Sequence, residues 1–520
     1  MHKTLAIIIF SLAMGLRSLG EGSEGVLPSE AQVPRSDSTW RAVGELVASQ
    51  AVTHLLGRYV MNEPFSQTSI KSIRHNLSSN FAWDDDNFYV NNAGHGYQGS
   101  LMFNAARSNG FSFWQSVPFT TAGSLLWEYF GETEQPSIND MLTTTFAGSF
   151  FGEMTHRLSR EIVDERTTGF ARFLREAAAA IINPVEGFHR IVDGRAWRIS
   201  STQHSTPRSS SARLLPAGRK NTQHPTPPIQ TSLSLGARYL SPIGGPGGGW
   251  HGSFQPYLSL ALQYGEAADG EPHHTPLDFF IIDGAIAFGK KQHLLSHFNA
   301  TGRIGSIPLF YNKRAIGELG LYQHFVYEDT HLPESSALKP STSSTSPLGG
   351  AEGASPFPFG EMVSLGPGIQ ITSASGARLA SFRLYAKGIA LGAVESDHYR
   401  FYNRHYNMGS GYGLSSQNHL TYGGIGALQL KVGYMHLYTW KGYEPRDLSE
   451  LSFENNYLNV LGDRSDARLL SLSLQAHISL SHQLQMTLGS SYYHRNTHYK
   501  YYPNRHSESY ETRAGLTWNF

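Results

Sequence analysis

Acidic residues and histidines recur among apolar residues in the amino-terminal half, and these residue types could support acid–base chemistry or metal binding. Burying a carboxylate or an imidazole in such a segment is costly unless the group finds a partner, so we expect a polar cluster inside this half. Arg107, Arg157 and Arg190 are the available cationic partners. The expected cluster comprises His95, Glu128, Glu132, Asp140, Glu153 and His156.

Glu153 and His156 are the candidate metal ligands within this cluster. They lie three positions apart, so on a helix they would share a face and could both bind one ion. Such a site needs further ligands from other helices, and His95 or Glu128 would supply them only if the tertiary structure brings them close. The alternative is a polar network that ties the helices together, and we expect this structural role. We therefore assign no catalytic residue and expect no cofactor.

Motif searches exclude several classes of enzyme. The chain contains no Gly-x-Ser-x-Gly elbow, no phosphate-binding loop, no HExxH motif and no cysteine. Its 41 basic and 41 acidic residues balance, which argues against a nucleic-acid partner. Serine and histidine are abundant, so an envelope lipid- or glycan-modifying enzyme with a Ser–His pair remains the alternative function.

Helical periodicity positions the polar residues of the amino-terminal half. The segments 40–62, 116–132, 136–165 and 168–184 have apolar residues at helical spacing or helix-starting residues. Ser137, with Asp140 three residues later, is the expected N-cap of the third segment. We predict a compact bundle of four or five helices.

Strand alternation dominates the rest of the chain. Over residues 470–480 the even positions are Leu, Ala or Ile, while the odd positions are Ser, Gln or His. The last strand alternates in the same way and ends on Phe520, as bacterial outer-membrane barrels commonly do. Such barrels have an even number of strands, so one of thirteen candidate segments, the Asn-rich 451–461, is assigned to a surface loop at 441–466. We predict an all-β transmembrane barrel of about 12 antiparallel strands, within a range of 10–14, with an N-terminal α-helical domain.

The barrel interior is expected to carry its own polar residues. In this topology the longer loops, near 243–253, 331–360, 395–410, 441–466 and 497–508, lie outside the cell, and brief turns lie inside. Mixed charges that line a small barrel ordinarily fill it with salt bridges and hydrogen bonds. The candidate lumen residues are Glu318, Tyr322, His324, Glu328, Arg383, Lys387 and Lys431.

The domain boundaries follow from shifts in composition. Residues 1–20 have the short basic start and apolar stretch of a signal peptide, and 21–39 form a linker. The helical domain, 40–198, is expected in the periplasm or plugging the barrel. A Ser/Thr/Pro-rich linker, 199–230, leads to the barrel at 231–520. The expected location is the bacterial outer membrane, with membrane lipid as one partner and the outer-membrane assembly machinery, which would bind the strand ending in Phe520, as another.

Several stretches resemble a family of Gram-negative proteins catalogued as domain of unknown function 3943. They include "FAWDDDNFYVNNAGHGYQGSLMFNAARSNGFSFWQS", "LWEYFGETEQPSINDMLTTTFAGSFFGE", "NPVEGFHR" and, in the second half, "GLYQHFVYED" and "WKGYEP". The family usually has Pro after the His of its "HPYQG" stretch, where this chain has Gly96. The resemblance implies an outer-membrane protein with a barrel and brings no activity. The expected role is therefore binding, anchoring or gated transport of an envelope component, and we do not expect an enzyme.

Overall fold

The computed structural model describes residues 36–83, 88–199, 229–242, 252–288, 295–330, 357–375, 378–395, 406–440 and 464–520. The expected signal peptide, most of both linkers and the Asn-rich segment 451–461 lie outside these ranges. The chain divides into two compact units. The helical unit comprises residues 1–84 and 93–221, and the barrel unit comprises 85–92 and 222–520.

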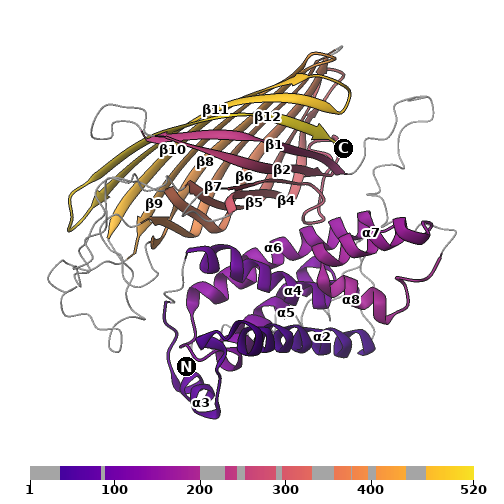
Figure 1. Ribbon diagram of the computed structural model, residues 1–520, viewed down its shortest axis with the longest axis vertical. Coiled ribbons are helices and arrows are strands. Elements are labelled where there is room, and N and C mark those ends of the chain that lie inside the picture. The colour runs from indigo at the N-terminus through magenta and orange to yellow at the C-terminus, as the bar shows by residue number, and fades with distance from the viewer. Residues whose placement is uncertain are drawn as a thin grey trace. The chain divides into compact units, whose positions relative to one another are not determined.

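The helical unit contains seven α-helices within the described residues, more than the four or five expected (Figure 1). The polar segment of α3, the Gly- and Asn-containing α4 and the short α8 were missed because none shows a long apolar repeat. No helix of the described ranges is long and apolar enough to span a membrane. The helices are α2 (Ser36–Leu55), α3 (Ile70–Ser78), α4 (His95–Arg107), α5 (Phe113–Leu126), α6 (Ile138–Ile162), α7 (Gly169–Ile182) and α8 (Pro184–Val192).

Side-chain caps set the first residues of the two central helices. Ser137 accepts a hydrogen bond from the backbone N–H of Asp140, which confirms the predicted start of α6. Ser112 and Gln115 form a reciprocal capping box at the start of α5. At its other end, α5 continues into a π-helical turn, Trp127–Gly131, which carries Glu128.

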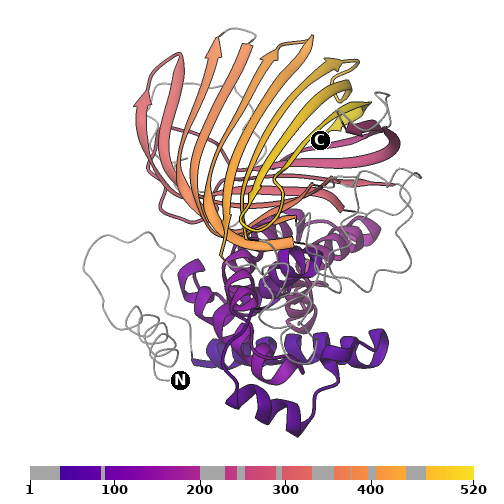
Figure 2. The same cartoon turned by 90° about the vertical axis from the view of Figure 1, so that its left-hand side faces the viewer.

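The barrel unit is a closed antiparallel barrel of twelve strands, as the strand count predicted (Figure 2). Each strand pairs with its neighbours in the chain, and β1 pairs with β12 to close the ring. The strands are β1 (Ile229–Pro242), β2 (Ser253–Tyr264), β3 (Phe280–Ala287), β4 (Leu295–Tyr311), β5 (Ala315–Thr330), β6 (Phe357–Ser375), β7 (Arg378–Glu395), β8 (Tyr406–Tyr422), β9 (Gly426–Thr439), β10 (Ser465–Ser479), β11 (Leu484–Tyr499) and β12 (Arg505–Asn519).

Phe520 takes part in the closure of the barrel. Its backbone N–H donates to the carbonyl oxygen of Thr231 on β1, at 2.9 Å, directly beyond the last register pair between Ser232 and Asn519. The Phe520 ring is 72% exposed. The terminal residue therefore extends the seam between the first and last strands and leaves its apolar ring on the surface.

The connection between β2 and β3, residues 265–279, is longer than the other connection nearby at this end of the barrel, residues 312–314 between β4 and β5. It does not project away but continues the pairing of β3 along the backbone of β4. The backbone N–H of Leu277 donates to Arg303, and His273 exchanges two backbone hydrogen bonds with Ser306. Leu277 and Phe279 are fully buried. We call residues 265–279 the inner turn.

A segment from the amino-terminal half belongs to the barrel unit, which the sequence did not lead us to expect. The Phe88 ring lies 5.3 Å from that of Tyr327 on β5 and 5.5 Å from that of Tyr406 on β8. The Asn91 amide donates to the hydroxyl of Tyr406 at 2.6 Å. By strand parity, these two tyrosines share the face of the exposed Leu319 and Leu321 on β5 and of Leu414 on β8. The segment Phe88–Asn92 therefore covers the outward face of the wall at its long-loop end.

Candidate functional site

A sheltered acid–histidine pair lies in the helical unit. His95 is the first residue of α4, and Asp140 is in the first turn of α6. The Nε2 atom of His95 lies 3.2 Å from Oδ1 of Asp140, and both side chains are buried. Burial lowers the pKa of His95 to about 4, so the imidazole is neutral at pH 7. Among the described residues, neither ring nitrogen of His95 has a hydrogen-bond partner of suitable geometry.

Glu128 anchors the turn that precedes α6. Its carboxylate accepts a hydrogen bond from the backbone N–H of Ser137 at 2.6 Å, and the Ser137 hydroxyl in turn caps Asp140. The amide of Asn76 donates to the carbonyl oxygens of Glu128 and Glu132, at 3.2 and 3.0 Å. Both glutamates are buried. The structure thus brings Glu128, Asp140 and His95 together. Glu132 is connected to Glu128 through the amide of Asn76.

Glu153 and His156 form a second group farther along α6. The carboxylate of Glu153 is fully buried and pairs with Arg107 at 2.7 Å and with Arg157 at 2.9 Å. Burial raises the pKa of Glu153, but the two guanidinium groups outweigh it and lower the pKa overall. Burial, assisted by Arg107, Arg160 and Arg157, holds the pKa of His156 well below its usual range. Two arginines already neutralise the carboxylate and would repel a metal cation, so this geometry supports the structural alternative over a metal site.

The two groups lie far apart along one helix. Asp140 and Glu153 are thirteen positions apart on α6, which corresponds to about 20 Å at the usual rise per residue. All six expected residues are buried. The burial of these six residues could be expected from the sequence because they lie among apolar residues. Their division into two groups could not be expected, because it depends on where α4 and α5 cross α6.

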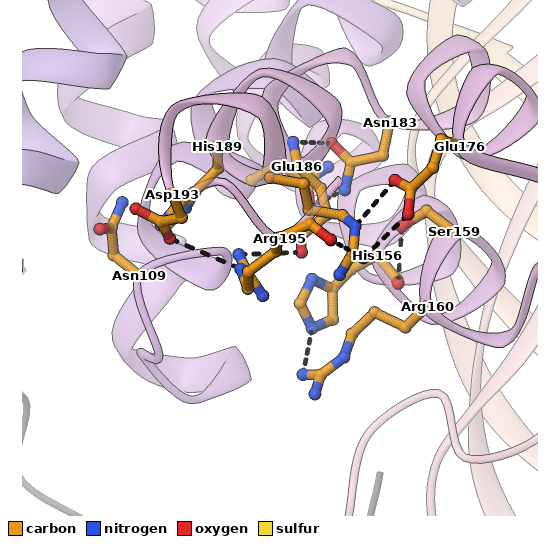
Figure 3. A network of polar contacts seen from close by, with 12 residues as sticks. Asn109, His156, Ser159, Arg160, Glu176, Asn183, Glu186, His189, Asp193 and Arg195 are labelled. Atoms are coloured by element: carbon orange, nitrogen blue, oxygen red, sulfur yellow. Dashed lines mark hydrogen bonds and ion pairs between the residues drawn. The ribbon is translucent and has the colours of Figure 1, made fainter. Parts of the chain in front are cut away.

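A further polar network joins α6, α7 and α8 (Figure 3). Arg190 pairs with Glu176 at 2.9 Å and with Glu165 at 3.2 Å, and Arg195 lies 3.5 Å from Glu186. His189 lies 2.9 Å from Asp193 one turn later. Apart from Arg190, sequence reasoning missed these residues; the charged residues within "NPVEGFHRIVDGR" were the available signal. Because cations and carboxylates alternate and pair, the network is suited to fastening α8 to its neighbours.

The barrel interior contains a buried ionic layer centred on Arg303. Its guanidinium lies 2.9 Å from Glu318 and 2.8 Å from Asp278 of the inner turn. The hydroxyl of Tyr322 donates to Glu318 at 2.8 Å. Asp278 also contacts His273, whose other ring nitrogen lies 2.9 Å from Asp269. This layer fastens the inner turn to the walls formed by β4 and β5.

His273 is the titratable group of the inner turn. Burial lowers its pKa, but hydrogen bonds with Asp269 and Asp278 dominate and raise the pKa of His273 to about 9. The imidazole is therefore a cation at neutral pH, placed between two carboxylates. Its contribution to the stability of the turn is complete below pH 6.5 and is lost as the pH rises through about 9.

Other interior contacts connect strands that are distant in the ring. Lys431 on β9 forms an ion pair with Asp283 on β3, and Arg383 on β7 donates to Gln263 on β2 at 2.7 Å. In the strand order, β9 and β3 are six positions apart in either direction, so they are opposite walls. Lys431 alternates with the exposed Leu430 and Arg383 with the exposed Leu384, which places both cations on the inward face.

The remaining expected lumen residues also have partners across neighbouring strands. Lys387 pairs with Glu361 at 2.7 Å. His324 shares a hydrogen bond with Thr301 at 3.0 Å, and Glu328 accepts one from Asn299 at 2.7 Å. Sequence reasoning missed several of the partners. Strand parity would have placed Asp283, Arg303 and Glu361 inward, whereas His273 and Asp278 lie in the inner turn, to which strand parity does not apply. These missed residues are His273, Asp278, Asp283, Arg303 and Glu361.

Comparisons with solved structures find bacterial barrels. The NanC porin is 10% identical, and the match covers 55% of this chain and 98% of that one with a TM-score of 0.25. The KdgM porin is 9% identical, with 55% and 99% covered and a TM-score of 0.20. OmpT, an outer membrane protein of Vibrio cholerae, is 8% identical, with 56% and 97% covered and a TM-score of 0.22. None of the curated proteins compared matches the sequence.

A comparison with family models finds one match. Residues 80–185 match the model described as Domain of unknown function (DUF3943). The matched range contains the first two quoted stretches of the resemblance, the segment Phe88–Asn92, and all six residues of the expected polar cluster. The resemblance is confirmed over this range: residues 80–185 match the model of the DUF3943 family.

Proposed function

We propose that the protein is an outer-membrane anchor: a barrel with a closed interior that holds its helical unit at the bacterial outer membrane. Membrane lipid would cover the apolar outward face. This face includes exposed Leu260, Leu321, Leu384, Leu430, Leu474 and Leu516 on six different strands. Alternation of these leucines with inward polar residues is the pattern of transmembrane barrels.

The observation that carries the proposal is the ion pair between Lys431 and Asp283 across the interior. A circular barrel of twelve strands, spaced about 4.8 Å apart and tilted by about 40°, measures roughly 24 Å across its backbone. A Lys–Asp pair joins Cα atoms that are at most about 13 Å apart, given standard bond lengths. The opposite walls must therefore approach each other at this level, where the ion pair crosses the lumen.

The inner turn narrows the interior further. Phe279 is fully buried against Tyr322 and Tyr385, and the guanidinium groups of Arg303 and Arg383 each lie 5.6 Å from the Phe279 ring centre. Charged and aromatic groups from three strands thus pack around one residue of the turn. Such an interior is suited to a stable anchor and not to free diffusion of solutes.

Planar-bilayer recording tests this proposal. The full chain should give no steady current steps, because paired side chains and the inner turn close the lumen. Two variants should conduct: Lys431→Ala with Arg383→Ala, which removes both bridging cations, and a chain in which residues 266–277 are replaced by two glycines. Arg468→Ala, which removes a half-exposed cation on the outward parity of β10, is the matched control and should stay silent.

Two results would contradict a closed anchor. The first is steady conductance of the unaltered chain. The second is silence of both opened variants after a heat-dependent gel shift has shown that they are folded. Deletion of residues 93–199 supplies a separate comparison: if closure is due to the barrel interior, the shortened protein should also remain silent.

The sheltered pair of His95 and Asp140 supports a second candidate function, an enzyme that modifies envelope lipid or glycan. The imidazole of His95 lies 3.2 Å from a carboxylate, which is the arrangement of a general base, although its lowered pKa makes it a weak base at neutral pH. The Ser124 hydroxyl, one helical turn before Glu128, and the Thr143 hydroxyl, one turn after Asp140, are buried without a hydrogen-bond partner in the described part of the chain. This candidate function has less support than the anchor, because no nucleophile within the described ranges contacts His95.

The variant His95→Gln separates a structural role from a chemical one. The folded state disfavours protonated His95, so stability of the helical unit should be complete above pH 6.5 and fall by roughly 3 kcal/mol by pH 4. The variant should lose this acid sensitivity in unfolding measurements. If His95 is also catalytic, mass spectrometry should show products from lipopolysaccharide or phospholipid vesicles with the unaltered chain and with the exposed control His75→Gln, but none with His95→Gln. Equal products from all three would exclude the catalytic role.

A further inference from the structure

Two histidines and a glutamate converge on the outward face of the barrel where β11 and β12 approach the long-loop end. His494 lies on β11, and His506 and Glu508 lie on β12. Their potential ligand atoms all lie within 4.8 Å of one another. The three side chains are about one third to one half exposed, with relative accessibilities of 32%, 57% and 29%.

Strand register produces this convergence. His494 pairs directly with Glu508, and Asn496 pairs with His506, so the three side chains occupy one face of the hairpin. His506 and Glu508 are separated by two positions, the spacing that returns to the same face of a strand. The connection between the strands is only residues 500–504. A short hairpin of this kind holds the three groups close together without any contribution from distant segments.

The distances match those of a tetrahedral metal site. Nδ1 of His494 lies 3.2 Å from Oε1 of Glu508, and Nε2 of His506 lies 3.4 Å from the same oxygen. Ligands at about 2.0–2.1 Å from a tetrahedral ion are separated by about 3.3 Å. The two imidazole rings have centroids 4.7 Å apart, and each ring has one nitrogen within 3.4 Å of the same carboxylate oxygen. We propose that His494, His506 and Glu508 bind a divalent transition-metal ion, with Zn²⁺ as the best-fitting ion.

The surroundings of Glu508 suit a cation better than those of Glu153. Its contacts come from His494, His506 and the hydroxyl of Tyr492, which donates to Oε1 at 3.0 Å. A neutral imidazole is a metal ligand, and a hydroxyl that hydrogen-bonds to a ligating carboxylate fixes its orientation. Glu153, in contrast, is held between two guanidinium groups.

The donor set also limits the type of metal. Two imidazoles and one carboxylate suit Zn²⁺, Ni²⁺ or Cu²⁺, whereas Ca²⁺ and Mg²⁺ prefer a shell of oxygen ligands. Three protein ligands leave the fourth tetrahedral position for water or for a ligand from outside the chain. The proposed site is independent of the closed interior because it lies on the other face of the wall.

Metal titration of the full chain, produced without an affinity tag and folded in detergent, tests the site. Calorimetry with Zn²⁺ should give one binding event that the variant His506→Ala weakens by at least about tenfold. Substitution by Co²⁺ should give the visible absorption bands of a tetrahedral site, and these bands should disappear in Glu508→Gln. His482→Ala removes an exposed histidine from the turn between β10 and β11, at the opposite end of the strands, and should leave binding unchanged.

Three outcomes would overturn the proposal. The first is the absence of Zn²⁺ binding by a chain that shows the heat-dependent gel shift of a folded barrel. The second is equal weakening by His506→Ala and His482→Ala, which would indicate adventitious binding by the 24 histidines of the chain. The third is a Co²⁺ spectrum that Glu508→Gln does not change. Loss of binding in a variant that keeps the gel shift supports the site, because the barrel is then still folded.

Discussion

Replacement of Glu153 by alanine is expected to lower the free energy of unfolding of the helical unit by about 3–5 kcal/mol. The carboxylate is fully buried and is the shared partner of Arg107 and Arg157. Its removal leaves two guanidinium groups facing each other beside a space of low polarity. The cost therefore comes mainly from unpaired charge and only secondarily from the lost volume.

Urea unfolding of the full chain, followed by the helical circular dichroism signal, measures this effect. Asp164→Ala is the matched control, because it removes a carboxylate that pairs with the exposed Arg166. Surface pairs of this kind contribute about 0–1 kcal/mol, so the control should be nearly neutral. Equal effects of the two variants would show that the Glu153 pair is not buried in solution.

A triple variant tests whether unpaired charge is the cause of the destabilisation expected for Glu153→Ala. A variant that replaces Glu153 together with Arg107 and Arg157 by apolar residues of similar volume removes the unpaired charges as well. Buried ion networks replaced in this way often lose little stability or gain some. The triple variant should therefore be more stable than Glu153→Ala, and a still lower stability would point to packing as the main contribution of these side chains.

Replacement of Gly148 by alanine is the second change with a large expected effect. A Cβ atom at this position would lie 2.5 Å from the Cα atom of Gly99 on α4, and one at Gly99 would lie 2.1 Å from the carbonyl oxygen of Thr144. Both obstacles are backbone atoms, so a side-chain rotation cannot relieve the overlap. The helices α4 and α6 must separate, and we expect a loss of about 3 kcal/mol, the upper part of the usual range for overpacking.

Gly44→Ala is expected to have the opposite effect on the free energy of unfolding, measured in the same way by urea unfolding. Gly44 lies within α2, and a Cβ atom there would meet no atom within 4 Å. Alanine in a helix is favoured over glycine by about 0.5–1 kcal/mol, so this variant should be more stable than the unaltered chain. If Gly148→Ala were also stabilising, the close crossing of α4 and α6 would be wrong.

Local patterns were sufficient for the strands, for four of the seven described helices and for much of the topology. The alternation of apolar and polar residues identified the strands, and the even-strand rule excluded segment 451–461 as a thirteenth strand and led to the confirmed total of twelve. Ser137 and Asp140 located the start of α6. Alternation also assigned Lys431 and Arg383 to the inward face. These predictions succeeded because the faces of a strand and the caps of a helix depend on residues only a few positions apart.

Pairing between distant residues could not be predicted in this way. Asp283 meets Lys431 only because β3 and β9 become opposite walls when β1 pairs with β12. The inner turn offered no apolar repeat, and the segment Phe88–Asn92 gave no sign in sequence that it belongs to the barrel unit.

The sequence by itself determined the alternation of inward and outward residues along the strands and the start of α6. The tertiary structure decided which inward charges meet and that the polar residues of α6 form two groups. It also decided that His494, His506 and Glu508 converge across a hairpin. Side-chain periodicity is set by the local backbone, whereas contacts between separate elements depend on the register, the crossing points and the closure of the whole ring.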